Sequence, residues 1–269
     1  MPTVEELYGE LWAGDEALEA ELDRSLDPRP VESLYDSFAE LGVKSADVLL
    51  DVGCGEGTHS VELARRFGCE IVALDLIPRH LDSARKRIEQ EGLEGRIRVV
   101  EARVESLPLA DEAVDHIWCR DMLNHVLLGN ALAECARVLK DGGHMLVYQT
   151  FATELLEPQE AERLYSAVAI VPENMSRSYF ESTARRAGFA IVSVDEIGSE
   201  WREHWLETGD RRTIDDLLHA ARLRRRREEL VARYGRATYE AALWGSSWGV
   251  YQLLGKLCPT VYVLEKRAG

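Results

Sequence analysis

A glycine-rich turn between an apolar run and a helical pattern is the strongest chemical signal in this sequence. The turn reads Asp51-Val-Gly-Cys-Gly-Glu-Gly57, and its glycines allow a sharp bend and a close approach of the backbone to a ligand. Asp75 ends a second apolar run 24 residues after Asp51. A carboxylate there would accept hydrogen bonds from ribose hydroxyls. The pattern predicts a site for a nucleoside-containing cofactor, and the structural alternative is a tight turn followed by an exposed acid.

The elements that must position these acids alternate between strands and helices. Short apolar runs predict strands, and apolar positions that recur every three to four residues predict helices. Such alternation indicates a mostly parallel sheet covered by helices on both faces, an α/β fold. Through residue 150 the predicted elements are strand 47–52, helix 58–67, strand 70–75, helix 78–91, strands 96–101 and 114–119, helix 127–139 and strand 144–150.

The second half of the chain is predicted to be mainly helical around two further strands, which gives a sheet of seven strands. The insert at about 199–258, before the last strand, is the candidate lid. Residues 1–44 form a predicted N-terminal helical cap, and 45–269 form the main domain. The predicted elements outside 47–150 are helices 3–24, 31–41, 153–169 and 176–188, strand 189–196, helical structure over 199–235 and strand 260–265.

The composition favours a small-molecule partner. The chain has 32 basic and 48 acidic residues and a net charge of −16. So negative a surface repels a phosphate backbone, and no nucleic-acid partner is expected. Within the insert, the run Arg224-Arg-Arg-Arg227 is followed by Glu228 and Glu229, which favours a solvated, salt-bridged helix face over a polyanion site.

The cysteine spacing and the apolar runs exclude several further classes. Five scattered cysteines lack the spacing of a zinc site or a disulfide framework, so no metal site is predicted. No run approaches 18 apolar residues, and the acidic N-terminus is unlike a signal peptide. We therefore expect a cytoplasmic protein with no membrane contact. The sequence is compatible with a homodimer as well as with a monomer.

The turn at 51–57 resembles motif I of the class I S-adenosylmethionine-dependent methyltransferases. The resemblance continues through Glu105-Ser-Leu-Pro108, Asp115-His-Ile-Trp-Cys-Arg-Asp-Met-Leu-Asn-His125 and Arg137-Val-Leu-Lys-Asp-Gly-Gly143, and it covers about 45–150. The glycine spacing, G-x-G-x-G, differs from the dinucleotide pattern G-x-G-x-x-G and argues against a nicotinamide oxidoreductase. The likeness implies a Rossmann-like sheet with S-adenosylmethionine as the cofactor.

The family likeness also implies a set of cofactor-binding residues. It places Asp51 against the amino group of the cofactor, Asp75 against the ribose and Leu76 against the adenine. One position departs from the family, because members commonly carry an Asp where this chain has Arg103. An arginine cannot accept a hydrogen bond from the adenine amino group, so either a backbone carbonyl replaces it or Arg103 flanks the ring. The implied residues are Asp51, Gly53, Cys54, Gly55, Asp75, Leu76, Arg103, Val104, Glu105, Cys119 and Arg120.

His125 is the candidate general base for methyl transfer. It follows the fourth predicted strand, where an acceptor would meet the methyl group, and the ordinary pKa of histidine is near 6.5. The alternative is that His125 caps the next helix or fills the loop. Asp121 is expected to be a structural or cofactor-side residue. Neither Gln149 nor Thr150 is acidic, so a dyad of His125 with an acid at the end of the fifth strand is not supported.

Aromatic side chains are frequent in the second half of the chain. Trp201 and Trp205 stand four residues apart, as do Trp244 and Trp248, so each pair can share a helix face. Core packing is one interpretation, and a pocket wall for a planar or cationic acceptor is the other. The likeness to sarcosine/dimethylglycine and sugar or natural-product methyltransferases, whose N-terminal helices close over the cofactor, implies the same role for Tyr8 and Trp12. The predicted acceptor-binding residues are Tyr8, Trp12, Asn124, Gln149, Trp201 and Trp244.

Three functional hypotheses follow. The layout is similar to that of sarcosine/dimethylglycine and sugar or natural-product methyltransferases, which implies methyl transfer to a small-molecule amine or hydroxyl. A methyltransferase acting on RNA or protein is the second hypothesis, and the acidic composition argues against it. The third is a module that binds S-adenosylmethionine without catalysis, and only an assay separates it from the first.

Overall fold

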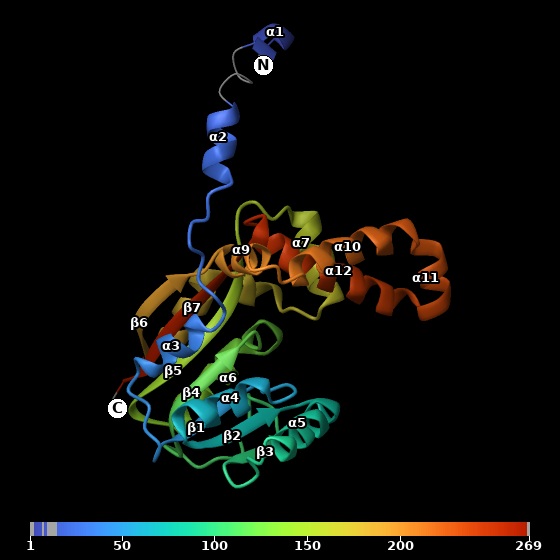
Figure 1. Ribbon diagram of the computed structural model, residues 1–269. Coiled ribbons are helices and arrows are strands. Elements are labelled where there is room, and N and C mark those ends of the chain that lie inside the picture. The colour runs from blue at the N-terminus through green and yellow to red at the C-terminus, as the bar shows by residue number, and fades with distance from the viewer. Residues whose placement is uncertain (1–2, 7, 10–14, 268–269) are drawn as a thin grey trace.

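A seven-stranded sheet organises the chain in the computed structural model, which describes residues 3–6, 8–9 and 15–267. The strand order is β3-β2-β1-β4-β5-β7-β6, and β7 runs antiparallel to both of its neighbours. The predicted mostly parallel, seven-stranded α/β fold is confirmed (Figure 1). The strands are β1 Val48–Val52, β2 Glu70–Asp75, β3 Ile97–Glu101, β4 Val114–Arg120, β5 Leu139–Ala152, β6 Phe189–Glu196 and β7 Leu257–Lys266.

Helices cover both faces of this sheet and form the insert before β7. From α3 to α6 they begin and end within two residues of the sequence-based predictions. The helices are α1 Val4–Glu6, α2 Asp15–Leu22, α3 Ser33–Ala39, α4 Thr58–Phe67, α5 Pro78–Gln90, α6 Leu128–Val138, α7 Pro158–Ala167, α8 Arg177–Arg186, α9 Glu200–Glu207, α10 Arg212–Arg225, α11 Arg227–Tyr234 and α12 Arg236–Leu253, with 3-10 turns η3 Leu123–His125 and η4 Pro172–Met175.

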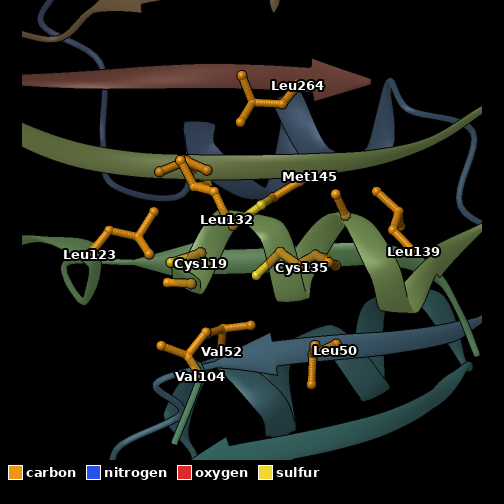
Figure 2. Packing of buried hydrophobic residues seen from close by; sticks show 14 of the residues in the cluster. Leu50, Val52, Val104, Cys119, Leu123, Leu132, Cys135, Leu139, Met145 and Leu264 are labelled. Carbon is orange, nitrogen blue, oxygen red and sulfur yellow. The ribbon is translucent and has the colours of Figure 1, made fainter. Parts of the chain in front are cut away.

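Two hydrophobic cores, one on each face of the sheet, hold these layers together. Successive residues of a strand point to opposite faces, so Leu49 belongs to one core and Leu50 to the other. The core that contains Leu50 is packed by α6 and α8, and Figure 2 shows part of it, including Leu132 and Cys135 of α6. The core that contains Leu49 is packed by α3, α4 and α5. Because both faces are buried, the strands read as nearly continuous apolar runs.

Several predicted elements differ from the structure in where they begin or end. The helix expected at 153–169 begins only at Pro158, because a residue that precedes proline disfavours helical geometry and Glu157 forms a capping box with Glu160. The strand expected at 144–150 is longer, since β5 runs without interruption from Leu139 to Ala152. The carboxyl end of β5 thus lies two residues beyond the predicted end, whereas β1 and β2 end at the predicted residues; β7 begins three residues before its predicted start.

The predicted N-terminal cap is divided in the structure. Helix α3 packs on the sheet through Phe38, which is fully buried. Helices α1 and α2 extend away from the sheet (Figure 1), and Leu18 and Leu22 of α2 are exposed. In this structure α1 and α2 therefore do not cover the ends of the parallel strands.

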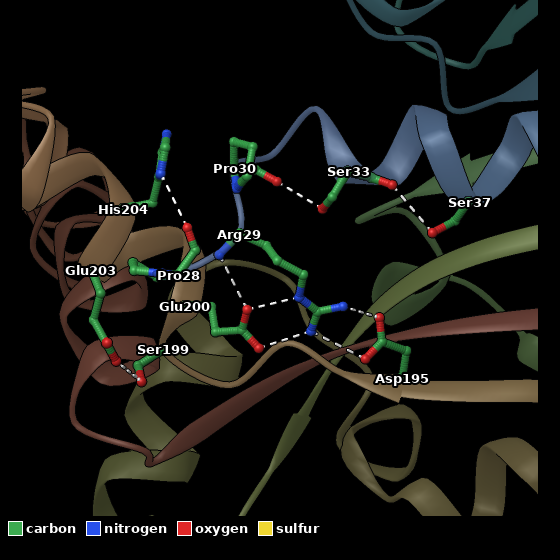
Figure 3. A network of polar contacts seen from close by, with 10 residues as sticks. All are labelled: Pro28, Arg29, Pro30, Ser33, Ser37, Asp195, Ser199, Glu200, Glu203 and His204. Atoms are coloured by element: carbon green, nitrogen blue, oxygen red, sulfur yellow. Dashed lines mark hydrogen bonds and ion pairs between the residues drawn. The ribbon is translucent and has the colours of Figure 1, made fainter. Parts of the chain in front are cut away.

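An arginine clamp fixes the segment between α2 and α3 to the insert. Arg29 Nη1 donates to Asp195 Oδ2 of β6 at 2.6 Å, and Arg29 Nε donates to Glu200 Oε2 of α9 at 2.7 Å (Figure 3). Beside this clamp, Pro28 O lies 3.2 Å from Nδ1 of His204. The clamp fixes the start of α9, the helix that carries Trp201. In the part of the chain that the structure describes, no helix is both long and apolar enough to cross a membrane.

Candidate cofactor and acceptor site

The glycine-rich turn lies at the carboxyl end of β1, between β2 and β4. The backbone N–H groups of Gly53 and Cys54 both donate to Leu74 O, at 2.8 and 2.9 Å. Gly53 has a φ of 76°, and a Cβ on it would lie 2.5 Å from Cγ of Met122. Gly55 has a φ of 53°, and a Cβ there would meet no atom within 4 Å. The turn is therefore packed tightly at Gly53 and has open space beside Gly55.

Asp51 is a buried carboxylate with one side-chain hydrogen-bond partner among the described residues. It is 2% exposed, and Ser60 Oγ donates to its Oδ2 at 2.5 Å. Burial raises the pKa of the Asp51 carboxyl to about 7, the hydrogen bond from Ser60 lowers it, and the nearby charge of Asp75 raises it further. Only one hydrogen bond within the described part of the chain offsets the buried negative charge of this carboxylate, so a cation beside it would stabilise the charged form. The protonated amino group at the methionine end of S-adenosylmethionine is such a cation.

Asp75 is held rigidly at the end of β2. Its Oδ2 accepts from the N–H of Gly55 at 2.9 Å, and its Oδ1 accepts from the N–H of Ile77 at 2.8 Å. Each carboxylate oxygen keeps further acceptor capacity, and the side chain is 8% exposed. The carboxylate is thus tied to the glycine turn and remains able to accept from the two hydroxyls of a ribose.

The other predicted cofactor residues are divided between the surface and the core. Arg103 is exposed, and its Nη2 donates to Glu105 Oε1 at 3.3 Å; Leu76 is 43% exposed. Val104 and Cys119 are 4% and 0% exposed and belong to the core packed by α6 (Figure 2). Their side chains face that core, so these two residues can line a cofactor only through their backbone.

A hydrogen-bonded chain of three side chains next to the turn was missed by the sequence analysis. Arg120 Nη1 lies 2.6 Å from His59 Nε2, and His59 Nδ1 lies 2.6 Å from the Tyr35 hydroxyl. Burial, followed by the charge of Arg120, lowers the pKa of His59 to about 3, so the imidazole is neutral. Arginine only donates, so Nε2 accepts and Nδ1–H donates to Tyr35. The signal available in the sequence was a histidine in the first turn of α4, two residues after Gly57.

The Arg120 guanidinium also lies close to two aromatic rings. Tyr148 of β5 and Trp201 of α9 stack with ring centroids 4.7 Å apart and planes at 4°. The Arg120 guanidinium carbon lies 5.5 Å from the Tyr148 ring centroid and 5.6 Å from that of Trp201. The insert thus reaches the strand ends through Trp201, which is 4% exposed.

Asp121 and His125 follow β4 at the same edge. Asp121 has a φ of 55°, a strained geometry for a residue with a side chain. The Asp121 side chain is 44% exposed. The pKa of its carboxyl is raised, because the loss of surrounding water outweighs the nearby positive charges of Arg120, Arg202 and His125, which lower it. His125 is exposed, and its Nδ1 lies 3.0 Å from Ala169 O. The nitrogen that faces a carbonyl must carry the proton, so Nε2 of neutral His125 is a lone-pair acceptor.

Two predicted acceptor residues contact the scaffold instead of open space. Asn124 is 1% exposed, and its Nδ2 donates to Thr150 O at 3.0 Å. Gln149 is fully buried; its Nε2 donates to Asn174 O at 3.2 Å, and its Oε1 has no partner among the described residues. The amide of Asn124 thus connects η3 to β5, and the amide of Gln149 connects β5 to η4.

Tyr8 and Trp244 are not brought to the strand ends. Tyr8 is 64% exposed and lies beyond α1, and Trp12 lies outside the described residues. Trp244 lines a cleft between α7 and helices α10, α11 and α12. The cleft is lined by no residue of the 51–57 turn, so Trp244 and Trp201 belong to different places in the molecule.

Comparison with known proteins agrees with this geometry. Residues 50–147 match a methyltransferase domain family. The chain is 35% identical over 130 residues to the methyltransferase GfsG of Streptomyces halstedii, with 46% of each chain covered. It is 26% identical to a sarcosine/dimethylglycine N-methyltransferase of Halorhodospira halochloris, covering 75% of this chain and 70% of that protein. The chain thus spans about half the length of the first relative.

The solved structures with a similar fold include a phosphoethanolamine N-methyltransferase 2 of Haemonchus contortus in complex with S-adenosylmethionine. The TM-score is 0.66 at 17% identity, over 98% of this chain and 60% of that one, so this likeness concerns the fold. Residues 50–147 of this chain thus match a methyltransferase domain, and their motifs resemble those of the class I S-adenosylmethionine-dependent methyltransferases. Asp51, Asp75 and the glycine-rich turn fit the cofactor of that family.

Proposed function

We propose that this protein transfers the methyl group of S-adenosylmethionine to a small-molecule amine or hydroxyl. The cofactor supplies a methyl group already activated on a sulfonium, so the protein mainly has to align the acceptor and exclude water. The observation that carries the proposal is the joint placement of Asp51 and Asp75. One is a buried carboxylate in need of a cation, and the other accepts from the N–H of Gly55 beside the open side of the turn.

His125 is the residue that we assign as the base. A base is needed when the acceptor carries a proton at the working pH. The contact between Nδ1 of His125 and Ala169 O fixes the ring and leaves Nε2 as an acceptor. The partly exposed carboxylate of Asp121 is close enough for the charge of His125 to lower its pKa. This arrangement supports proton removal at His125 next to a negative charge that stabilises the imidazolium.

Two arginines whose positive charges have few close acidic partners favour an acceptor with a negative charge. Arg202 is 14% exposed; its Nε donates to the neutral amide of Gln252 at 2.8 Å, and the carboxylate of Asp216 is 3.8 Å away. Burial lowers the pKa of Arg202. Arg120 has a buried Nε without a hydrogen-bond partner in the described part of the chain. A buried cation with loose partners is costly, and a carboxylate or phosphate on the acceptor would compensate both.

The alternatives are a methyltransferase for RNA or protein and a binding module without catalysis. The net charge of −16 disfavours RNA, because phosphate groups and acidic surfaces repel one another. The relatives include enzymes named for sarcosine or dimethylglycine and for erythromycin, which supports a small acceptor. A protein that binds S-adenosylmethionine but transfers no methyl group to any acceptor would correspond to the binding module.

Transfer of a labelled methyl group tests the proposal. Full-length protein is incubated with labelled S-adenosylmethionine and a panel of amines, amino acids, sugars, phenols and tRNA. The panel includes pairs of similar compounds that differ in a negatively charged group, such as glycine and ethanolamine. We expect label in a small molecule, and we expect the negatively charged member of each pair to be the better acceptor. Label only in tRNA or in protein would contradict the small-molecule assignment, and a preference for the uncharged members would contradict the role of Arg202.

A further inference from the structure

A second cleft, remote from the glycine-rich turn, is rich in arginine. It has a volume of about 650 Å³ and lies between α7, α10, α11 and α12. Figure 1 shows α10, α11 and α12 projecting from the sheet. Four arginines line the cleft, one from each helix: Arg163, Arg224, Arg227 and Arg236. We call them the cleft arginines.

Three cleft arginines have no acidic partner. In the ranges 3–6, 8–9 and 15–267, no carboxylate oxygen lies within 4.0 Å of Arg163, Arg224 or Arg227. The fourth, Arg236, has its Nε 3.9 Å from Glu240 Oε1. The sequence predicted a solvated, salt-bridged helix face for the arginine run. In the structure all four arginines of the run are exposed, and among the described residues Arg226 pairs with Glu229.

The charge of the cleft contrasts with that of the rest of the chain. Residues 199–258 contain 11 basic and 9 acidic residues, whereas the remainder contains 21 basic and 39 acidic ones. The cleft gathers four arginines and two glutamates, so it has an excess of positive charge, and its arginines repel one another. A multivalent anion in the cleft removes that repulsion.

We propose that this cleft binds a small phosphorylated molecule with at least two negative charges. Guanidinium groups match phosphate oxygens with paired N–H donors. Glu162 and Glu240 also line the cleft, so the lining keeps two net positive charges, which suits a doubly charged ligand. Tyr239, Leu243 and Trp244 form an apolar wall against which the rest of the molecule packs. None of these residues belongs to the strand ends that hold the proposed methyl-transfer site.

Titration calorimetry with inorganic pyrophosphate, on the full-length protein saturated with S-adenosylmethionine, tests the proposal. We expect saturable binding to the wild type. The double variant Arg224→Ala/Arg227→Ala should bind at least about tenfold more weakly, because each variant position removes charge-assisted hydrogen bonds. The matched control is Arg222→Ala/Arg225→Ala, which removes two exposed charges from α10 that do not line the cleft, and it should bind nearly as tightly as the wild type.

A third variant separates a built site from general charge attraction. Glu162→Gln removes a negative charge from the lining, so it should tighten pyrophosphate binding. An unchanged affinity for S-adenosylmethionine shows that each variant is folded. Absence of saturable binding to the wild type, or an equal loss in the two double arginine variants, would overturn the proposal. Neither result would affect the methyl-transfer assignment, since the two sites share no residue.

Discussion

At the scale of single residues, the account depends on how a few side chains are charged and held. Asp51 and Asp75 have the same carboxylate but different surroundings. Asp75 is compensated by two backbone N–H groups, whereas Asp51 is buried with a hydrogen bond from Ser60. The difference makes Asp51 the group whose protonation responds to a bound cation.

Binding of S-adenosylmethionine should therefore release protons through Asp51. The pKa of Asp51 is about 7 without a ligand, and the positive amino group of the cofactor stabilises the carboxylate and lowers that pKa. We expect release of roughly half a proton at pH 7 and an affinity that falls as the pH drops below 7. Calorimetry in buffers of different ionisation enthalpy measures the release. Asp51→Asn should abolish it, and an equal release in that variant would exclude Asp51 as the source.

The same shift has a consequence for the stability of the unliganded protein. Because the folded pKa of Asp51 is raised from 3.8 to about 7, the folded state holds this proton more tightly than the unfolded state. The stability that Asp51 contributes is present below pH 4 and is lost as the pH rises to 7. Asp51→Asn should lack this component of the pH dependence in denaturant titrations. Parallel pH profiles for the variant and the wild type would contradict it.

Removal of His125 should slow methyl transfer without weakening cofactor binding. If Nε2 of His125 takes the acceptor proton, His125→Ala should lower kcat by roughly 10²- to 10⁴-fold and remove the acidic limb of the pH profile. The measurement is the kcat profile from pH 6 to 9 with the acceptor identified by the labelling panel. An unchanged kcat over that range would exclude His125 as the base and leave it a structural role through its contact with Ala169 O.

At the scale of elements, α12 connects the insert to the strand ends. Gly249 of α12 lets Arg202 pass close to the helix, because a Cβ there would lie 2.7 Å from both Arg202 Cζ and Asp216 Oδ2. Gln252, one turn later, accepts from Arg202 Nε and lies 3.4 Å, Nε2 to Oγ1, from Thr150. One helix therefore sets the position of the arginine that faces the proposed acceptor.

Two glycine-to-alanine variants of α12, compared with each other, test this packing. Gly249→Ala should destabilise the protein by about 1–3 kcal/mol, because Arg202 is confined and cannot move aside without losing its partners. Gly245→Ala on the same helix meets no atom within 4 Å and should stabilise by up to about 1 kcal/mol through helix propensity. Thermal unfolding of the two variants gives the comparison. A gain in stability for Gly249→Ala would show that Arg202 is not held in place.

Some elements were predictable because the sequence marks both of their ends locally. Helix α4 and strand β2 begin and end at the predicted residues, since the apolar runs and glycines that define them are local signals. The Arg120–His59–Tyr35 chain was not predictable, because its members come from β4, α4 and α3 and meet only after folding. The same holds for Trp244, whose spacing suggested an acceptor wall but whose helix faces a different cleft.

At the scale of the whole molecule, the charge is divided between two parts. The body of the chain is strongly acidic and carries the cofactor turn, whereas residues 199–258 carry a small excess of basic residues. The overall composition indicated only the net charge, because the contrast appears only when residues 199–258 are counted apart from the rest of the chain. The insert contributes Trp201 and Arg202 to the proposed acceptor side and, through its outer helices, lines the arginine cleft.

Calorimetric titration of the full-length protein with S-adenosylmethionine tests the central claim most directly. The account predicts saturable binding of one equivalent, at least about tenfold weaker in Asp75→Ala, because the ribose hydroxyls lose a charged acceptor. Folding of the variant is checked by its far-ultraviolet circular dichroism. A wild-type protein that binds neither S-adenosylmethionine nor its demethylated product, or a folded Asp75→Ala variant that binds as tightly as the wild type, would contradict the account.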